Sequence, residues 1–282
     1  MKQSFMGCIA AISLAAASWC LIPIVVSGQA APLAQGDAKK AEATKPTPHL
    51  ADGHPDLNGD WYRPLLFLGA GEKEGDTLKY VPKANPEFAA AIRPPEPMYA
   101  PPYKPELLDK VKQYDEQQVK FDPGFSCKPP GVPRIGPPHK IVQTRNEVIF
   151  LYSDLVGNFW RIIPTDGRPH RTDADPSYLG DSVGRWEGGT LVVDSNNFTD
   201  DTWLADNGMF HSDALHVIER LTRQGDTILY EVTVDDPKVF TKPWVQKPRT
   251  LTLMNEPLDE APPCVEKDAP NMMGLQHHGN PR

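Results

Sequence analysis

The stretch LHVIERLTRQGDTILYEVTV, residues 215–234, decides the fold class. Apolar and polar side chains alternate in both halves, and a glycine interrupts them, which is the pattern of a β-hairpin. With Gln224-Gly225 as a two-residue loop, Glu219 lies directly opposite Tyr230. One face of the hairpin is then almost wholly apolar, so we expect it to point into a core. That face carries Leu215, Val217, Leu221, Ile228, Tyr230, Val232 and Val234.

Glu219 is the exception on this apolar face. A carboxylate among aliphatic side chains costs free energy unless it is paired. Either an arginine from elsewhere in the chain pairs with Glu219, or the carboxylate carries protons in a functional site. We therefore take Glu219 as the first candidate catalytic residue.

The hairpin belongs to a longer β-rich region over residues 139–256. Short strands without intervening helices predict an antiparallel meander that closes into a lipocalin-like barrel, with a β-sandwich as the alternative. Gly59-Asp60-Trp61 is similar to the Gly-x-Trp of a lipocalin first strand. The expected strands cover 141–145, 147–154, 157–163, 184–187, 190–195, 214–223, 226–235 and 249–254.

The residues before this region are rich in proline. Eighteen of the 31 prolines fall between residues 46 and 138, which excludes a run of central strands there. We expect residues 49–138 to wrap over the β region as extended chain with one helix near 105–120. Residues 31–48 read as a disordered linker, and residues 257–282 as a C-terminal tail.

The N-terminus predicts export. A basic Lys2, an apolar stretch over residues 7–26 and small residues up to Ala30 are typical of a signal peptide over residues 1–30. An uncleaved membrane anchor is the alternative. The expected location is the periplasm or the exterior. Of the four cysteines, Cys127 and Cys264 would remain after cleavage, and they most simply form a disulfide, with two buried thiols as the alternative.

Composition limits the partners. The chain has 282 residues with 37 acidic and 29 basic side chains, a formal net charge of −8. This balance argues against nucleic acid and against electrostatic binding to an anionic membrane after signal cleavage. The sequence indicates no cofactor and leaves the oligomeric state open.

Two motifs invite a more specific chemistry. Residues 180–184 match the G-x-S-x-G of serine hydrolases, but a hairpin pattern follows instead of a helix, which favours a glycine-rich turn. His211 and His216 lie five residues apart, unlike a zinc-binding helical pair, so we expect no metal site. Both histidines and Asp181 remain candidate proton carriers beside Glu219.

Aromatic and basic residues in the β region are candidate ligand contacts. Large aromatic side chains around a small barrel fill its core or form a stacking surface for a ligand. The polar loop 196–213 is long for a meander and could serve as a binding element. The candidate ligand-binding residues are Tyr230, Trp203, Trp186, Arg161, Arg220 and His170.

Several motifs occur together in this order: PDLNGxW from Pro55, CxPPGxPR from Cys127, DGRxH from Asp166, GDSVGRWEG from Gly180 and HSDALHVxER from His211. Over residues 50–266 this series resembles a large family of exported bacterial proteins for which no activity is established. The segment 256–263 departs from the usual form of that family. The resemblance implies an architecture and a set of residues, and it implies no reaction.

Two functions follow as expectations. In the first, an exported β-barrel binds a small, partly apolar or aromatic molecule. In the second, the same cavity performs acid–base chemistry as a lyase, isomerase or hydrolase.

Overall fold

The structure is a computed structural model that describes residues 45–62, 72–74, 77–79, 97–154, 156–205, 208–255, 257–261 and 264. All of them belong to the unit Ala43–Arg282. The signal peptide expected over 1–30 lies outside the described residues, as do most of the expected linker and tail. Among the helices that are described, none is long and apolar enough to cross a membrane.

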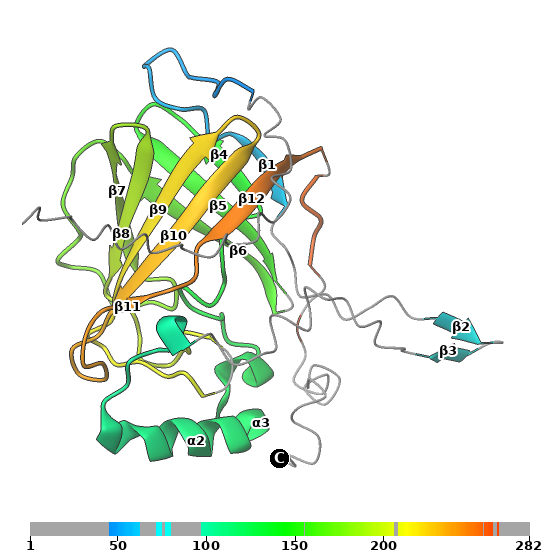
Figure 1. Cartoon of the computed structure of the whole chain (residues 1–282), viewed down its shortest axis with the longest axis vertical. Helices are drawn as coiled ribbons and strands as arrows, with labels where there is room; N and C mark the ends of the chain where they lie inside the picture. The colour runs from blue at the N-terminus through cyan, green and yellow to red at the C-terminus, as the bar shows by residue number, and fades with distance from the viewer. Residues whose placement is uncertain are drawn as a thin grey trace, which may run out of the picture. The chain divides into compact units, whose positions relative to one another are not determined.

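One curled antiparallel sheet dominates the described chain (Figure 1). Its strands follow the order β6-β5-β4-β1-β12-β10-β9-β8-β7. The two outer strands, β6 and β7, lie side by side without joining the hydrogen-bonded order, so the sheet forms a nearly closed barrel. The expected mainly β barrel is therefore confirmed, and the sandwich alternative is wrong. The strands are β1 (Gly59–Tyr62), β4 (Lys140–Gln143), β5 (Glu147–Asp154), β6 (Gly157–Pro164), β7 (Asp181–Glu187), β8 (Thr190–Asn196), β9 (His216–Gln224), β10 (Thr227–Asp235) and β12 (Arg249–Met254).

The hairpin of β9 and β10 has a different register from the expected one. Its loop is Gly225-Asp226, because Gln224 pairs with Thr227, and Glu219 therefore pairs with Val232. Gly225 has a φ of +59°, and primed hairpin turns require a positive φ at the first loop position, which a glycine adopts far more easily than a glutamine. The partner of each residue moves by two positions, so every side chain keeps its expected face. All seven apolar residues expected inside are buried.

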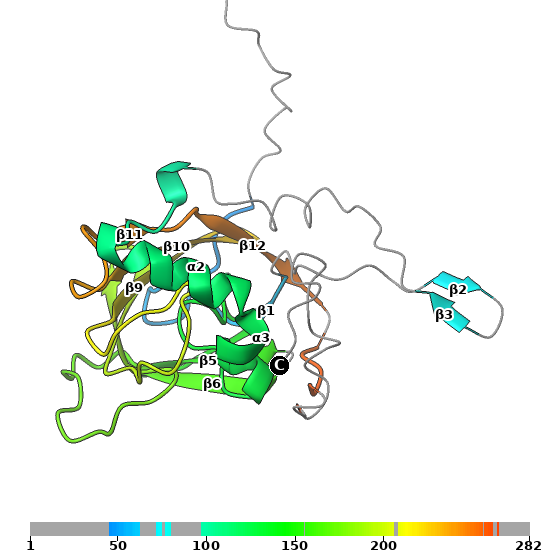
Figure 2. The same cartoon turned by 90° about the horizontal axis from the view of Figure 1, so that it is seen from below.

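Helical turns close one end of the barrel (Figures 1 and 2). Tyr114 of helix α2 (Leu108–Glu116) stacks on Trp203 and packs edge-on against Phe210, with centroid distances of 5.9 and 5.7 Å. The helix expected near 105–120 is thus present as a series of shorter pieces. These are η2 (Pro105–Leu107), α2 (Leu108–Glu116) and α3 (Gln118–Phe121), flanked by η1 (Pro97–Tyr99) and η3 (Pro123–Ser126).

Three short strands lie outside the order of the barrel sheet. β11 (Trp244–Val245) pairs with β10, and β2 (Glu72–Glu74) pairs with β3 (Thr77–Lys79) in a separate two-stranded sheet. The sequence pattern predicted none of these three strands.

The N-terminal segment 45–58 crosses the opposite end of the barrel. The backbone N–H of Gly225 donates to Thr47 Oγ1 at 3.0 Å, and that of Leu57 donates to Gln143 Oε1 at 2.7 Å. Between these two points, His54 stacks on Trp186 with ring centroids 4.5 Å apart. Residues from three separate hairpins therefore hold this segment over the end of the barrel opposite the helices.

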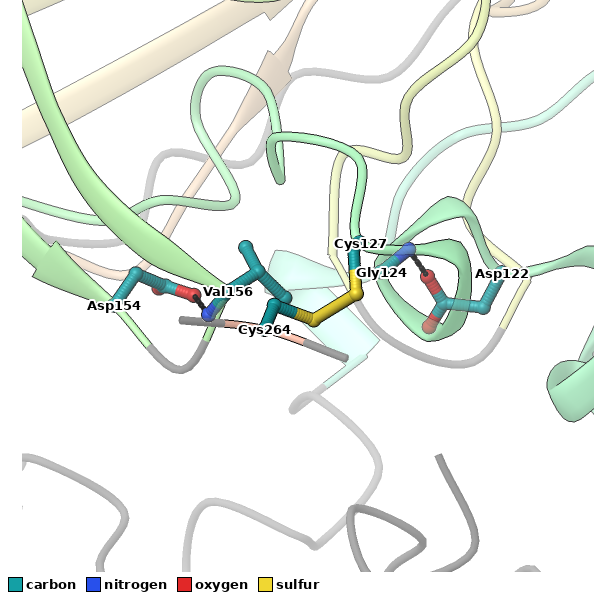
Figure 3. Close-up of a disulfide and its surroundings, with 6 residues drawn as sticks. All are labelled: Asp122, Gly124, Cys127, Asp154, Val156 and Cys264. Atoms are coloured by element: carbon teal, nitrogen blue, oxygen red, sulfur yellow. Dashed lines mark hydrogen bonds between the residues drawn. A yellow bond between two sulfur atoms is a disulfide. The ribbon is translucent and has the colours of Figure 1, made fainter. Parts of the chain in front are cut away.

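Cys127 and Cys264 form a disulfide with Cα atoms 5.7 Å apart. Figure 3 shows it beside the turn between β5 and β6, where Asp154 accepts a hydrogen bond from Val156. The expected pairing is confirmed, and it joins the proline-rich segment to the C-terminal segment.

Candidate functional site

Six polar side chains meet inside the barrel. Strand alternation turns each of them inward, and each is at most 8 % exposed. A buried polar cluster of this size is unusual in a small barrel, whose interior is ordinarily filled by apolar side chains. We call it the inner cluster; it consists of Tyr152, Arg161, Ser182, Ser195, Glu219 and Tyr230.

Arg161 is the centre of the inner cluster. Its Nη2 lies 2.6 Å from Glu219 Oε2 and donates hydrogen bonds to the hydroxyls of Ser182 and Ser195 at 3.0 and 2.8 Å. Its Nη1 donates to the Tyr152 hydroxyl at 3.3 Å. Burial by itself lowers the pKa of Arg161, but the charge of Glu219 and the contact with Tyr152 raise it by more than burial lowers it. The net pKa is therefore raised, and the guanidinium stays charged.

Tyr230 completes the inner cluster on the far side of Glu219. Its hydroxyl donates to Glu219 Oε1 at 2.7 Å. Burial and the adjacent carboxylate raise the pKa of Tyr230 well above its ordinary value. Tyr230 is therefore a neutral donor, and the inner cluster carries one positive and one negative charge.

Two atoms of the inner cluster have no hydrogen-bond partner among the described residues, Arg161 Nε and Glu219 Oε2. The two N–H groups of Nη2 already point to Ser182 and Ser195, so Oε2 receives charge attraction from Nη2 but no hydrogen bond. A buried N–H without an acceptor, such as that of Arg161 Nε, costs about 1–3 kcal/mol, whereas the charge of Nη2 offsets part of this cost at Oε2. Native proteins satisfy nearly all such atoms, and an exception indicates stored strain, a functional role, or a bound water, ion or ligand.

The sequence identified half of the inner cluster. Glu219, Tyr230 and Arg161 were all candidates, and Arg161 is the arginine that the alternative interpretation of Glu219 required. Ser182 was assigned only to a glycine-rich turn, but residues 181–187 form β7, so Ser182 points into the barrel from a strand. A serine on a strand lacks the exposed turn that a nucleophile needs, which rules out the serine-hydrolase motif.

A second polar group of residues lies on the outer face of β7, β8 and β9. His170, in the loop before β7, contacts Asp181 Oδ2 through Nδ1 at 2.9 Å and Asp194 Oδ1 through Nε2 at 3.1 Å. His216 contacts the same Asp194 oxygen through Nε2 at 2.7 Å. Arg171 donates to Asp181 Oδ1 at 2.7 Å. We call these five residues the outer cluster.

The carboxylates of the outer cluster have lowered pKa values. Burial by itself raises the pKa of both, but hydrogen bonds from Arg171 and His170 to Asp181 outweigh it. Hydrogen bonds from His216 and His170 do the same for Asp194. Asp181 and Asp194 are therefore ionised at neutral pH, and they orient the two imidazole rings. The sequence suggested His170, Asp181 and His216 but missed Asp194. Asp194 pairs with Ile218 and lies diagonally across from His216, so only the register of β8 with β9 brings the two side chains together.

His211 and Trp203 lie in neither cluster. His211 is 4 % exposed; its Nδ1 contacts the Ser212 carbonyl at 2.8 Å and its Nε2 contacts Thr202 Oγ1 at 2.6 Å. Burial lowers the pKa of His211, which favours the neutral ring. Trp203 is 2 % exposed, between Tyr114 and the guanidinium of Arg134. Trp203 therefore packs loop 196–213 against helix α2, whereas both contacts of His211 lie within the loop itself.

The two remaining candidates also lie apart. Trp186 projects to the inner side of β7 under the N-terminal segment, where it stacks on His54. Arg220 is on the outer face of β9, where its Nη1 donates to Glu187 Oε2 at 2.8 Å. The structure therefore distributes the candidate residues over the barrel interior, its outer face and its two ends, and it does not gather them in one shared cavity.

In the described part of the chain, no group of three or more histidine, cysteine, aspartate or glutamate side chains is arranged to hold a metal ion. Comparison of the chain with protein-family models, with curated proteins and with solved structures finds no match. The resemblance to exported bacterial proteins therefore stays a prediction.

Proposed function

We propose that this protein is an exported β-barrel that binds a small, partly apolar or aromatic molecule at the inner cluster. The carrying observation is that Arg161 Nε and Glu219 Oε2 are buried in the barrel without hydrogen-bond partners. A ligand that bonds to these atoms would recover the free energy that their burial costs.

The surroundings of these two atoms also support a binding role. Phe150 and Tyr152 are fully buried beside Arg161, and the Arg161 guanidinium carbon lies 5.7 Å from the centroid of the Phe150 ring. A few fixed polar groups among apolar and aromatic side chains are typical of small-molecule sites. Export rests on the predicted signal peptide together with the Cys127–Cys264 disulfide, because disulfides persist in oxidising compartments.

The proposal can be tested with p-cresol, a small aromatic probe, and isothermal titration calorimetry. We expect saturable binding to the wild-type protein and loss of binding in Arg161→Met. The matched control is Trp160→Ser, because Trp160 lies on the outer face of the same strand and is 64 % exposed. Binding that Trp160→Ser abolishes, or no binding at all, would contradict the proposal.

One observation favours a second function, acid–base catalysis at the outer cluster. The His216 side chain is 42 % exposed, and Asp194 holds its Nε2, whereas its Nδ1 has no partner in the described residues. A histidine oriented by a carboxylate can take a proton from an attacking water. This site would be separate from the inner cluster, unlike the shared cavity expected from the sequence.

Hydrolysis of p-nitrophenyl acetate tests this second function. Water would attack the acyl carbon, His216 would take the proton, and p-nitrophenolate would leave. We expect His216→Gln to lose the activity above the buffer rate, whereas Arg220→Gln, on the same face of β9, keeps it. Equal rates for the wild type and His216→Gln would exclude the outer cluster as the site of this chemistry.

A further inference from the structure

The charge balance of the inner cluster restricts the chemistry of its ligand. Arg161 and Glu219 form one ion pair, side-chain exposures 3 % and 1 %, and Tyr230 stays neutral because its pKa is raised. The other members, Tyr152 and the two serines, are hydroxyl groups. The net charge of the inner cluster is therefore zero, so an ionised ligand would bring an uncompensated charge into the barrel. Burying such a charge costs several kcal/mol.

The two unpartnered atoms require opposite hydrogen-bonding roles. Arg161 Nε carries an N–H and can only donate, whereas the ionised Glu219 Oε2 can only accept. A ligand group that satisfies both must accept one hydrogen bond and donate another. A hydroxyl does both with a single oxygen, whereas an ether can only accept and a carboxylate cannot donate.

The positions of the two atoms suit one oxygen atom. Nε and Nη2 are bonded to the same carbon of Arg161, and Nη2 lies 2.6 Å from Glu219 Oε2. An oxygen at ordinary hydrogen-bond distance from Nε can therefore also reach Oε2. The serine hydroxyls do not take this role, because no hydrogen bond joins either of them to Arg161 Nε or to Glu219 Oε2.

We infer that the inner cluster selects a neutral ligand that carries a hydroxyl group, such as a phenol or an alcohol, and rejects carboxylates and ethers of the same shape. The inference rests on the proposed binding function and names its ligand class. In the bound state, the ligand oxygen accepts from Arg161 Nε–H and its O–H donates to Glu219 Oε2. No proton is transferred and no bond is broken.

Three probes with the same ring test this inference: p-cresol, 4-methylanisole and 4-methylbenzoate. At neutral pH the cresol is an uncharged phenol, the anisole can only accept, and the benzoate is an anion. Calorimetric titration of the wild-type protein should give p-cresol a dissociation constant at least tenfold lower than that of either other probe. Trp160→Ser should show the same order, because it changes only the outer face of β6.

The outcomes separate the two proposals. Binding of all three probes with less than a tenfold preference for p-cresol overturns the inference and leaves the binding function standing. If 4-methylbenzoate binds more tightly than p-cresol, the inference is likewise overturned and the binding function stands. Failure of all three probes to bind overturns the binding function and the inference together.

Discussion

Arg161 and Glu219 form an ion pair across the closure of the barrel, with Nη2 of the arginine 2.6 Å from Oε2 of the glutamate. Their strands, β6 and β9, are not neighbours in the hydrogen-bonded order. The same Nη2 atom donates hydrogen bonds to Ser182 of β7 and Ser195 of β8, the two strands between β6 and β9 around the barrel. The side chain of Arg161 therefore links the two edges of the sheet, where ladder hydrogen bonds do not join β6 to β7.

Glu219→Gln should lower the free energy of unfolding by about 3–5 kcal/mol, because it leaves the buried Arg161 charge without its counter-charge. The measurement is chemical denaturation followed by far-UV circular dichroism. Arg161→Met combined with Glu219→Leu should destabilise less than Glu219→Gln alone, because it removes both buried charges. A single variant as stable as the wild type would mean that the pair does not stabilise the barrel.

Replacing both Cys127 and Cys264 by serine should lower the free energy of unfolding by about 5 kcal/mol in the chain-entropy model, because the disulfide closes a loop with a sequence separation of 137 residues. Counting free thiols in denatured, non-reduced protein checks the bond itself. Two reactive thiols per molecule would contradict the pairing.

Acid should weaken the outer cluster. The pKa values of Asp181 and Asp194 are lowered below the ordinary 3.8 in the folded chain. These carboxylates therefore contribute stability above that value, and the contribution is lost as the pH falls through their folded pKa. Denaturation between about pH 5 and pH 2 should show a steep loss for the wild type and a shallower one for Asp194→Asn. If the stabilities of the wild type and Asp194→Asn fell equally with pH, Asp194 would not contribute to this pH dependence.

Gly208→Ala should detach loop 196–213 from helix α2. Gly208 has a φ of +74°, and an added Cβ would lie 2.3 Å from the carbonyl oxygen of Val111. Gly188 is the matched control, because its φ is +60° and nothing lies within 4 Å of a Cβ there. Both alanines carry a left-handed cost of about 1–2 kcal/mol. Gly208→Ala should lower the melting temperature further than Gly188→Ala and expose Trp203 to a fluorescence quencher; equal melting temperatures would contradict the tight packing.

The barrel was predictable because buried and more exposed side chains alternate along β5, β9 and β10. In the hairpin of β9 and β10, a register error of two residues moved no side chain to the other face. The expected strand over 147–154 has the same bounds in the structure. By contrast, β7 begins three residues before the predicted start. The prediction began too late because the small residues at the start of β7, among them Gly184, are typical of a turn. Gly184 is in fact a close-packing position, where an added Cβ would lie 2.9 Å from the Thr165 side chain.

The candidate site was only partly predictable. Glu219 could be identified because a carboxylate interrupts an apolar face. Its partner Arg161 lies 58 positions earlier in the printed sequence, and only the closure of the barrel brings the two strands together. Trp203 seemed to belong to a polar loop, but the loop folds its apolar side chains under α2, where Trp203 is 2 % exposed. Long-range packing of this kind leaves no local pattern in the sequence.

The Arg161 Nε–H resonance tests the central claim most directly. It can be assigned in a proton–nitrogen NMR spectrum by its absence from Arg161→Met, and then followed while p-cresol is added. We predict that the resonance shifts and saturates with the calorimetric dissociation constant, while the indole resonance of the exposed Trp160 stays in place. An unmoved Arg161 resonance, with the shifts confined to Trp160, would contradict a ligand site inside the barrel.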